Sequence, residues 1–326
     1  MSLRHRLLKL LSDGEFHSGE DLGAALGVSR MAIWKHLKVL RELGLDFEVV
    51  RGKGYRLPAA IELLDGDEIS SEISRSTATH IDSINIFHEL DSTNNWLREQ
   101  CLNDAPSGTV CLAEMQHAGR GRRGRSWVSP YAANLYLSLL WRSPAGAAAL
   151  GGLSLVTGIA VLRCLQTWGV DAAGLKWPND ILVRNAKLAG ILIDVVGEAS
   201  GPCAVIIGVG VNVCMPPLAG ADIDQSWTDL SHLTGGSELS RNRLAAGLLD
   251  QLLPAVASFE AAGLQPFLEE WRRYDSVAGC QVDVQLPDQT VSGTACGIDD
   301  GGALLVETVN GRRRFTSGEV SVRFAS

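Results

Sequence analysis

The 326-residue sequence lacks the features that mark membrane, secreted and zinc-binding proteins. No uninterrupted apolar run reaches the roughly 20 residues that a membrane-spanning helix needs. The amphipathic N-terminus, MSLRHRLLKLL, has no small-residue cleavage site of the kind that ends a signal peptide. The seven cysteines are an odd number, with no C-x-x-C pair and no histidine pair nearby. These absences argue against a disulfide framework and a zinc site, and they predict a cytoplasmic protein with no membrane partner.

Negative charge dominates the sequence, but it is unevenly distributed. Residues 1–58 hold ten Lys/Arg and seven Asp/Glu, whereas the remainder holds nineteen and thirty, and the net charge is −8. A basic N-terminal segment on an otherwise acidic protein indicates one module that binds a polyanion.

The N-terminal segment has the pattern of a winged helix-turn-helix. Apolar residues at helical spacing predict helices over 3–12, over 18–27 and over 30–43. The stretch DFEVVRGKGYRL (46–57) predicts two strands around a Gly-containing turn, which form the wing. With 30–43 as the recognition helix, the expected DNA-binding residues are Arg30, Trp34, Lys35, Lys38, Arg51 and Lys53. The alternative is a small protein-interaction domain with a solvated basic face.

The rest of the chain alternates strands and helices and then changes to short strands. Strands are expected over 84–90, 108–116, 134–141, 175–183, 187–196 and 203–213, with a long apolar helix over 148–169 and two helices within 239–273, broken near Pro254 or Gly263. From Gly279 onward, short alternating strands predict a small closed β-barrel. The expected fold class is α+β: a winged helix-turn-helix over 1–60, a central mixed α/β domain over 61–274 and a small SH3-like β-barrel over 275–326.

One stretch, AEMQHAGRGRRGRSWVSP (113–130), is unusual because four arginines are interleaved with three glycines. Gly119–Gly124 fits G-x-G-x-x-G, but a dinucleotide-binding loop needs a helix directly after the glycines, and another strand follows here. A patch for single-stranded nucleic acid is disfavoured, because the surrounding domain is acidic and Trp127 is the only aromatic residue of the loop. We therefore predict a pliable lid that becomes ordered over an acyl or phosphoryl anion.

Two longer motifs resemble the signatures of the biotin–protein ligases: GRGRRGRSW at 119–127 and KWPNDIL at 176–182. DSTN at 91–94, KLAGIL at 187–192 and GVGVNV at 208–213 stand in the order typical of that family. With its winged helix, the whole chain is similar to the bifunctional members, which are both ligases and repressors of the biotin operon.

The resemblance implies an ATP-dependent, AMP-forming biotin–[acetyl-CoA-carboxylase] ligase. Such an enzyme joins the biotin carboxylate to the α-phosphate of MgATP, holds biotinyl-5′-AMP, and transfers biotin to a lysine of the biotin carboxyl carrier protein. It also implies binding to operator DNA, repression of biotin synthesis with biotinyl-AMP as corepressor, and a homodimer that forms when the adenylate binds. The strand expected over 187–196 is the predicted dimer surface.

The resemblance implies roles for individual residues as well. The expected catalytic residues are Lys187, Arg122 and Lys176. The expected biotin-binding residues are Ser92, Thr93, Asn94, Gln116, Arg120, Gly121, Arg122 and Lys187. The expected ATP-binding residues are Arg122, Arg125, Trp127, Lys176, Asn179, Asp180 and Asn212, and no metal site is assigned to protein ligands alone.

Simpler roles remain open for several of these residues. Ser92 or Thr93 could cap a helix, Asn179 and Asp180 could form a plain turn or bind Mg²⁺, and Lys176 could be a surface lysine. Trp127 and Asn212 could pack locally. Two other functions also remain open: a lipoate–protein ligase, and a ligand-sensing transcription factor without catalysis.

Overall fold

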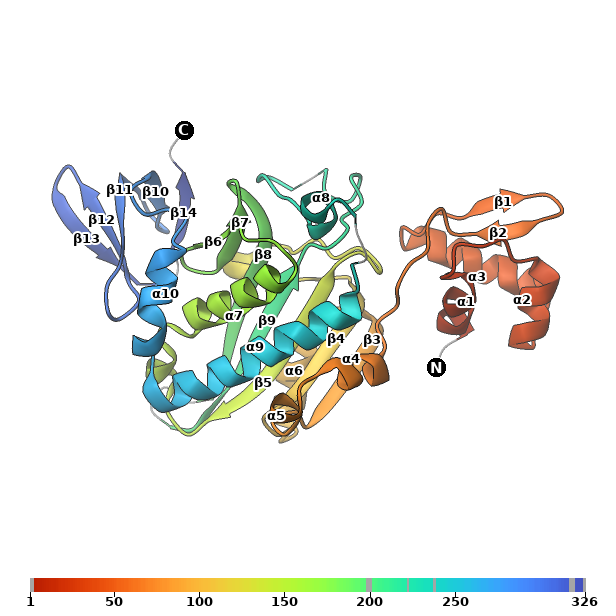
Figure 1. The fold of residues 1–326 in the computed structure, drawn as a ribbon, viewed down its shortest axis with the longest axis horizontal. Helices are drawn as coiled ribbons and strands as arrows, with labels where there is room; N and C mark the ends of the chain where they lie inside the picture. The colour runs from red at the N-terminus through yellow and green to blue at the C-terminus, as the bar shows by residue number, and fades with distance from the viewer. Residues whose placement is uncertain (1–2, 198–200, 222, 237–238, 317–319, 325–326) are drawn as a thin grey trace.

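The computed structural model describes residues 3–197, 201–221, 223–236, 239–316 and 320–324. A helical module with a short hairpin lies at one end of the molecule, and a sheet of short strands lies at the other (Figure 1). Between them is a seven-stranded sheet with helices on both faces. The α+β class predicted from the sequence is therefore confirmed.

The N-terminal module is the predicted winged helix. Its elements are α1 (Leu3–Leu11), α2 (Gly19–Leu26), α3 (Arg30–Glu42), β1 (Glu48–Val50) and β2 (Gly54–Arg56). The side chains of Ser18 and Ser29 accept hydrogen bonds from the backbone at the starts of α2 and α3, and Gly27 ends α2 in the left-handed conformation. The apolar faces of the three helices meet in one buried core, which includes Ile33 and Leu37.

The central sheet has the order β3-β4-β5-β9-β8-β7-β6, and all neighbouring pairs except β3–β4 are antiparallel. Its strands are β3 (Ser83–Leu90), β4 (Thr109–Gln116), β5 (Leu135–Ser143), β6 (Ala173–Lys176), β7 (Asp180–Val183), β8 (Ala186–Gly197) and β9 (Cys203–Val211). β4, β5 and β9 are almost wholly buried, because helices cover both of their faces.

The helices divide between the two faces of this sheet. The α-helices after the N-terminal module are α4 (Gly66–Glu72), α5 (Arg75–Ala78), α6 (Thr93–Leu102), α7 (Leu153–Thr167), α8 (Leu230–Thr234), α9 (Arg241–Ala262) and α10 (Leu268–Arg273), with short 3-10 turns η1 (Arg122–Gly124), η2 (Ala147–Leu150) and η3 (Gln265–Phe267). α7 and α9 pack together over one face, and α6 covers part of the other (Figure 1).

Two helical segments, Ala147–Thr167 and Arg241–Ala262, are long and apolar enough to span a membrane by length and composition. A count of uninterrupted apolar residues does not detect the first segment, because Arg163 lies within it. Both segments contribute to the main core of the central domain. More than half of the most apolar part of each segment is buried within the protein.

Three local predictions differ from the structure. The stretch 175–183, expected as one strand, is the β6–β7 hairpin with its turn at Trp177–Asn179. The long helix expected over 148–169 begins only at Leu153, after two glycines. A helix break was expected near Pro254 or near Gly263. α9 continues through Pro254 and ends at Gly263, so the break lies at the second position.

The C-terminal unit is an antiparallel sheet with the order β13-β12-β11-β10-β14. Its strands are β10 (Gln281–Gln285), β11 (Thr290–Ile298), β12 (Leu304–Thr308), β13 (Gly311–Phe315) and β14 (Ser321–Phe324). The small C-terminal β-unit predicted from the sequence is confirmed, and within the described residues its outer strands β13 and β14 are not hydrogen-bonded to each other. The sheet is joined to the central domain by the buried Trp177, whose indole nitrogen donates to the Gly302 carbonyl at 3.0 Å.

Candidate active site

A cavity of about 350 Å³ opens between the arginine-glycine loop, the β6–β7 hairpin and the centre of the large sheet. This volume lies at the lower end of the range typical of small-ligand pockets. Every residue predicted to bind biotin or ATP lines the cavity, except Asn212. The lining also includes β14 of the C-terminal sheet, so segments more than 200 residues apart in the chain meet here.

One end of the cavity is built from neutral hydrogen-bonding groups. The buried Ser138 hydroxyl lies 2.7 Å from the Thr93 hydroxyl and 2.6 Å from the Asn94 amide oxygen. The Gln116 side-chain oxygen accepts from the Thr93 backbone N–H at 2.9 Å, and its amide nitrogen donates to Ser129 at 3.0 Å. These contacts fix donors and acceptors at the cavity wall, which suits a ligand with amide-like groups.

Ser92 stands at the N-cap position of α6, but its side chain makes no capping hydrogen bond. It is buried and lines the cavity. The helix-cap alternative therefore explains the position of Ser92 in the chain but not the use of its hydroxyl group.

Glycines on β8 and β9 make room for the side chains at the cavity. A Cβ atom on Gly208 would lie 2.2 Å from the Asn94 amide oxygen, and one on Gly210 would lie 2.6 Å from the Trp127 ring. On Gly190 it would lie 2.9 Å from the same ring. Because real Cβ atoms do not approach so closely, these three positions must remain glycine for Asn94 and Trp127 to lie where they do.

The other end of the cavity is cationic and is organised around Asp180. The Lys187 ammonium lies 2.7 Å from one carboxylate oxygen of Asp180, and the Lys176 ammonium lies 3.7 Å from the other. Lys187 also lies 5.3 Å from the centre of the Trp127 ring, within cation–π range. The arrangement concentrates positive charge while holding both lysines in defined positions.

Burial perturbs two of these cations. Desolvation lowers the pKa of Lys176, although the Asp180 carboxylate opposes the shift. Desolvation likewise lowers the pKa of Arg122, again opposed by Asp180. Both groups therefore hold a charge that the surroundings solvate poorly, and an anion in the cavity would stabilise that charge.

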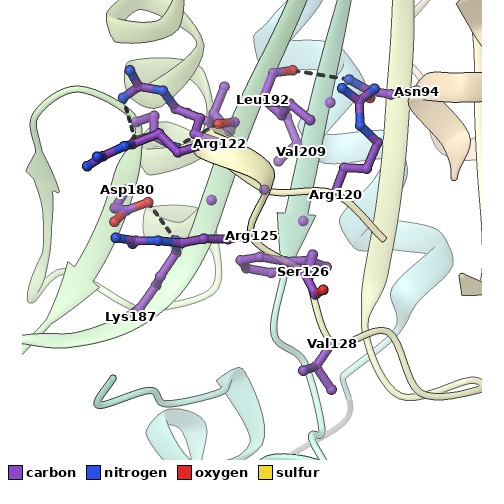
Figure 2. Close-up of a pocket in the computed structure, with 18 of the residues that line it drawn as sticks. Asn94, Arg120, Arg122, Arg125, Ser126, Val128, Asp180, Lys187, Leu192 and Val209 are labelled. Carbon is purple, nitrogen blue, oxygen red and sulfur yellow. Dashed lines mark hydrogen bonds and ion pairs between the residues drawn. The ribbon is translucent and has the colours of Figure 1, made fainter. Parts of the chain in front are cut away.

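The arginine-glycine loop folds as a small hairpin over the cavity. Its backbone is closed by hydrogen bonds from Gly121 N to the Arg125 carbonyl (2.7 Å) and from Trp127 N to the Gly119 carbonyl (2.8 Å). Figure 2 shows Arg122 and Arg125 at the same end of the cavity as Asp180 and Lys187, and Arg120 near Asn94.

Each of three loop arginines contacts a different part of the protein. Arg120 donates to Asp194 at 3.0 Å and to Asn95 at 2.9 Å, and Arg122 donates to Asn179 at 3.3 Å. Arg123, in the left-handed conformation, reaches the carbonyl of Gln285 in the C-terminal sheet at 3.5 Å. The loop thus touches α6, β8, the β6–β7 turn and the C-terminal unit.

Asn212 does not line the cavity. It is buried, and its amide nitrogen donates to the backbone carbonyls of Lys187 (3.3 Å) and Thr228 (3.0 Å). These contacts fit the local packing role considered as the alternative, and a contact with the nucleotide stays a prediction. Asn212 still serves the site indirectly, because it fixes the backbone from which Lys187 projects.

Two residues that contact the cavity lining were not identified from the sequence. Ser138 lies within the mainly apolar, buried part of β5 and bonds to Thr93, and Asp194 pairs with Arg120 and Asn94. The isolated serine in a buried strand was the available signal, because a buried hydroxyl group needs a partner. Nothing in the sequence indicated that Asp194 would face the loop.

The oxygen atoms proposed as possible Mg²⁺ ligands are already engaged. Asp180 faces both lysines, and the Asn179 amide oxygen accepts from Arg122. Within the described ranges, no group of three or more His, Cys, Asp or Glu side chains could hold a metal ion. These residues fit a role in positioning cations better than a role as a metal cage.

The predicted DNA-binding residues all lie exposed on one module. Arg30, Trp34, Lys35 and Lys38 project from α3, and Arg51 and Lys53 lie in the turn of the wing. The opposite face of α3 is buried through Ile33, Leu37 and Leu40.

This module rests on the central domain at the base of the arginine-glycine loop. Tyr131, which closely follows the loop, is buried in the core of the N-terminal module. Arg4 of α1 pairs with Glu89 at 3.1 Å, and the other oxygen of Glu89 lies 3.1 Å from His117, which precedes the loop. Both ends of the loop are therefore connected to the surface through which the winged helix contacts the central domain, here called its docking surface.

Comparison with known proteins gives consistent matches for all three units. The biotin/lipoate A/B protein ligase family matches residues 86–212, an HTH domain matches residues 3–56, and the biotin protein ligase C terminal domain matches residues 278–323. The bifunctional ligase/repressor BirA of Salmonella typhimurium is 43% identical over 319 residues, and that of Escherichia coli is 42% identical over 320 residues. Each of these alignments covers 98% of this chain and 97% of the relative.

Among solved structures, the biotin protein ligase from Aquifex aeolicus in complex with biotin and ATP is similar, with a TM-score of 0.65 and 27% identity. That match covers 75% of this chain and 100% of the other. The similarity to the bifunctional relatives, by contrast, extends over the N-terminal module as well.

Proposed function

Because the chain belongs to the biotin/lipoate A/B protein ligase family, we propose that the cavity forms biotinyl-5′-AMP from biotin and ATP and retains it until transfer. The protein is an ATP-dependent biotin protein ligase that also carries an HTH repressor module. The site residues, the regulatory mechanism and the domain boundaries near residues 60 and 274 are our proposals.

The observation that carries the adenylation proposal is the convergence of Lys176, Lys187, Arg122 and Arg125 at one end of the cavity. A carboxylate and a triphosphate repel each other, so they react only where positive charge offsets both. Preorganised cations aimed at developing negative charge are the usual means of stabilising such a transition state. Asp180 holds the two lysines in position before the substrates arrive.

The reaction itself requires one bond to form and one to break. A carboxylate oxygen of biotin attacks the α-phosphorus of ATP, the bond to the β-phosphate oxygen breaks, and pyrophosphate leaves with the electron pair. Lys187 neutralises the carboxylate and bridging oxygen, while Lys176 and Arg122 face the phosphate oxygens. Mg²⁺ enters with ATP, bound chiefly by the phosphates, because Asn179 and Asp180 are engaged with cations.

The neutral end of the cavity favours biotin over lipoate. Thr93, Asn94 and Gln116 line this end and carry both donors and acceptors, which match the N–H and C=O groups of a ureido ring, and Ser138 lies behind them and bonds to Thr93 and Asn94. The dithiolane ring of lipoate has no such groups, so it could not use the hydrogen-bonding capacity that these side chains have beyond their contacts within the protein. A site built to hydrogen-bond its ligand discriminates strongly against an analogue that lacks the partner groups.

In the second half-reaction, a lysine of the biotin carboxyl carrier protein attacks the carbonyl carbon of the mixed anhydride. The new amide bond forms, the acyl–phosphate bond breaks, AMP leaves, and the amine proton passes to solvent. The arginine-glycine loop protects the anhydride from water until the carrier arrives. Arg120, tied to Asp194 and Asn95, anchors the loop on the biotin side.

We propose that the winged helix binds operator DNA as a homodimer with biotinyl-AMP as corepressor. The module is basic, and its docking surface connects to both ends of the loop through Glu89, His117 and Tyr131. Ordering the loop on the adenylate would reduce the entropy lost on dimerisation. The distal part of β8, which extends beyond its pairing with β7, offers the dimer an edge strand. The use of ATP, a carrier protein and DNA supports a cytoplasmic location.

Biotin-dependent exchange of labelled pyrophosphate into ATP tests this proposal. Exchange should require biotin and should not occur with lipoate. Lys187→Ala should abolish most of it, whereas Lys53→Ala, which removes an exposed cation from the wing, should not alter it. Pyrophosphate exchange that occurs with lipoate, or that occurs with neither biotin nor lipoate, would exclude the proposed chemistry.

A further inference from the structure

Large exposed hydrophobic side chains are concentrated on the winged helix. The described part of the chain exposes eight of them, and four belong to this module: Met31 (63% exposed), Trp34 (51%), Val49 (56%) and Val50 (40%). The module contains less than a fifth of the chain. Single exposed apolar residues are ordinary, but a local concentration marks an interaction surface.

Met31 and Trp34 lie together on the recognition helix. They are three residues apart, so they project from the same face of α3, which begins at Arg30. The face toward the module core is already filled by Ile33 and Leu37. Neither exposed side chain is therefore needed for packing within the module.

Their position within α3 matches a known geometry of DNA recognition. In helix-turn-helix proteins, the N-terminal residues of the recognition helix contact base edges in the major groove. Met31 and Trp34 occupy the first two turns of α3, whereas Lys38 lies one turn farther along the same face. The apolar pair thus stands where bases are read, and the lysine stands where it can reach a phosphate.

The major groove offers one apolar group to such a pair, the 5-methyl group of thymine. We infer that Met31 and Trp34 select operator sequences with thymines at the positions that face the start of α3. This inference rests on the proposed DNA-binding function and specifies which bases the helix reads. The polar edges of guanine and cytosine would be left without hydrogen bonds against these two side chains.

The charge around the pair favours DNA over a protein as its occupant. Arg30, Lys35 and Lys38 flank the pair and are exposed, and Glu42 at the end of α3 is the only acidic residue of the helix. Arg51 and Lys53 add positive charge in the wing. A protein partner would need apolar side chains to contact Met31 and Trp34 and acidic groups to pair with the surrounding cations. A DNA duplex supplies both, because it carries thymine methyl groups and phosphates.

Replacing thymine by deoxyuridine tests the inference, because it deletes the methyl group and leaves base pairing and hydrogen-bonding edges unchanged. The probe is a duplex selected from a randomised library by the full-length protein in the presence of biotin and MgATP. Each thymine is then replaced in turn. Burying one methylene-sized group corresponds to about 0.8 kcal/mol, so each contacted methyl should change Kd about fourfold per half-site.

Met31→Ala and Trp34→Ala should each remove the deoxyuridine effect at a distinct position. Both side chains are exposed, so the thermal midpoint should not change. Leu102→Ala, which truncates a comparably exposed residue in the central domain, is the matched control and should preserve the whole pattern. Lys38→Ala should weaken binding to all duplexes and preserve the relative penalties.

The outcomes separate this inference from the function on which it rests. A protein that selects no duplex would overturn both. Selection of a duplex that tolerates deoxyuridine everywhere would overturn the thymine assignment alone. Unchanged DNA binding in Met31→Ala and Trp34→Ala, combined with a loss of self-association in sedimentation, would assign the pair to a protein contact instead.

Discussion

Replacing Lys176 by alanine removes one of the two lysines that face Asp180. The Lys176 side chain is only 13% exposed, and its ammonium lies 3.7 Å from the Asp180 carboxylate at the cationic end of the cavity. Removing one preorganised group that stabilises developing negative charge typically raises the barrier by about 2.7–4 kcal/mol. We therefore expect biotin-dependent pyrophosphate exchange to fall roughly 100- to 1,000-fold.

The pH dependence of the same reaction distinguishes a charge effect from a loss of packing. Burial lowers the pKa of Lys176 below its ordinary 10.5, so this lysine loses its proton at a lower pH than an exposed lysine does. Exchange should decline as pH rises through that lowered value. Lys176→Arg keeps the cation charged across the whole range, so it should retain activity and extend the alkaline limb to higher pH.

The assay measures pyrophosphate exchange from pH 6.5 upward for the wild type and both variants, with thermal midpoints measured alongside. Exchange within a few-fold of the wild type in Lys176→Ala would show that the ammonium does not act on the transition state. An unchanged alkaline limb in an active Lys176→Arg variant would show that another group titrates there.

Four further changes have defined outcomes. Lys187→Ala should reduce exchange by about 100- to 1,000-fold because its ammonium lies 2.7 Å from Asp180 in the cavity, with near-wild-type exchange contradicting the role. Arg122→Gly should release biotinyl-AMP about 10- to 100-fold faster, measured by rapid filtration, and an unchanged release rate would exclude the loop as a lid. Tyr131→Ala should weaken adenylate-dependent operator binding by about 5- to 100-fold while leaving most of the exchange intact, and equal operator affinity would remove it from the coupling route. Burial raises the pKa of the Asp275 carboxyl from 3.8 to about 6, so its ionisation destabilises the folded state progressively between these values. Asp275→Asn should therefore raise the free energy of unfolding by on the order of 2–3 kcal/mol at pH 8 and leave it unchanged near pH 4, as measured by urea denaturation, and a pH-independent difference would contradict this account.

Local elements followed closely from the sequence because their determinants are local. The helices expected over 18–27 and 30–43 are found as α2 and α3, which Ser18 and Ser29 cap, and the apolar spacing Ile33, Leu37, Leu40 forms the buried face of α3. Side-chain capping and helical periodicity act within a few residues, so they can be recognised without knowledge of the rest of the chain.

Structural features that depend on contacts between residues far apart in the chain could not be predicted from local sequence patterns. The pairing of strands in the C-terminal sheet includes contacts between residues far apart in the chain, so short alternating strands indicated a small β-unit but not that β14 pairs with β10. The stretch 175–183 was expected as one strand, although Pro178 and Asn179 are turn formers, because Leu175 and Ile181–Val183 on the two sides of the turn have the apolar character of one buried strand. Tyr131 reads as an ordinary loop residue, and only the assembled structure places it in the core of another module.

The cavity illustrates both cases. Its lysines, arginines and small polar residues belong to recognisable motifs, and the structure brings them together. Asn212 belongs to a motif as well, but its partners are backbone carbonyls, which a sequence does not display. Ser138 and Asp194 belong to no motif, although they orient Asn94 and Arg120.

The path of the biotin carboxylate oxygen tests the central claim most directly. The full-length protein would be given biotin labelled with ¹⁸O in its carboxylate, together with MgATP and the carrier protein, and the products would be analysed by mass spectrometry. If the carboxylate attacks the α-phosphorus, the bridging oxygen leaves with AMP when the carrier lysine attacks, so AMP should carry one heavy oxygen and pyrophosphate none. Unlabelled AMP, or label in pyrophosphate, would contradict the acyl-adenylate route that this cavity is proposed to support.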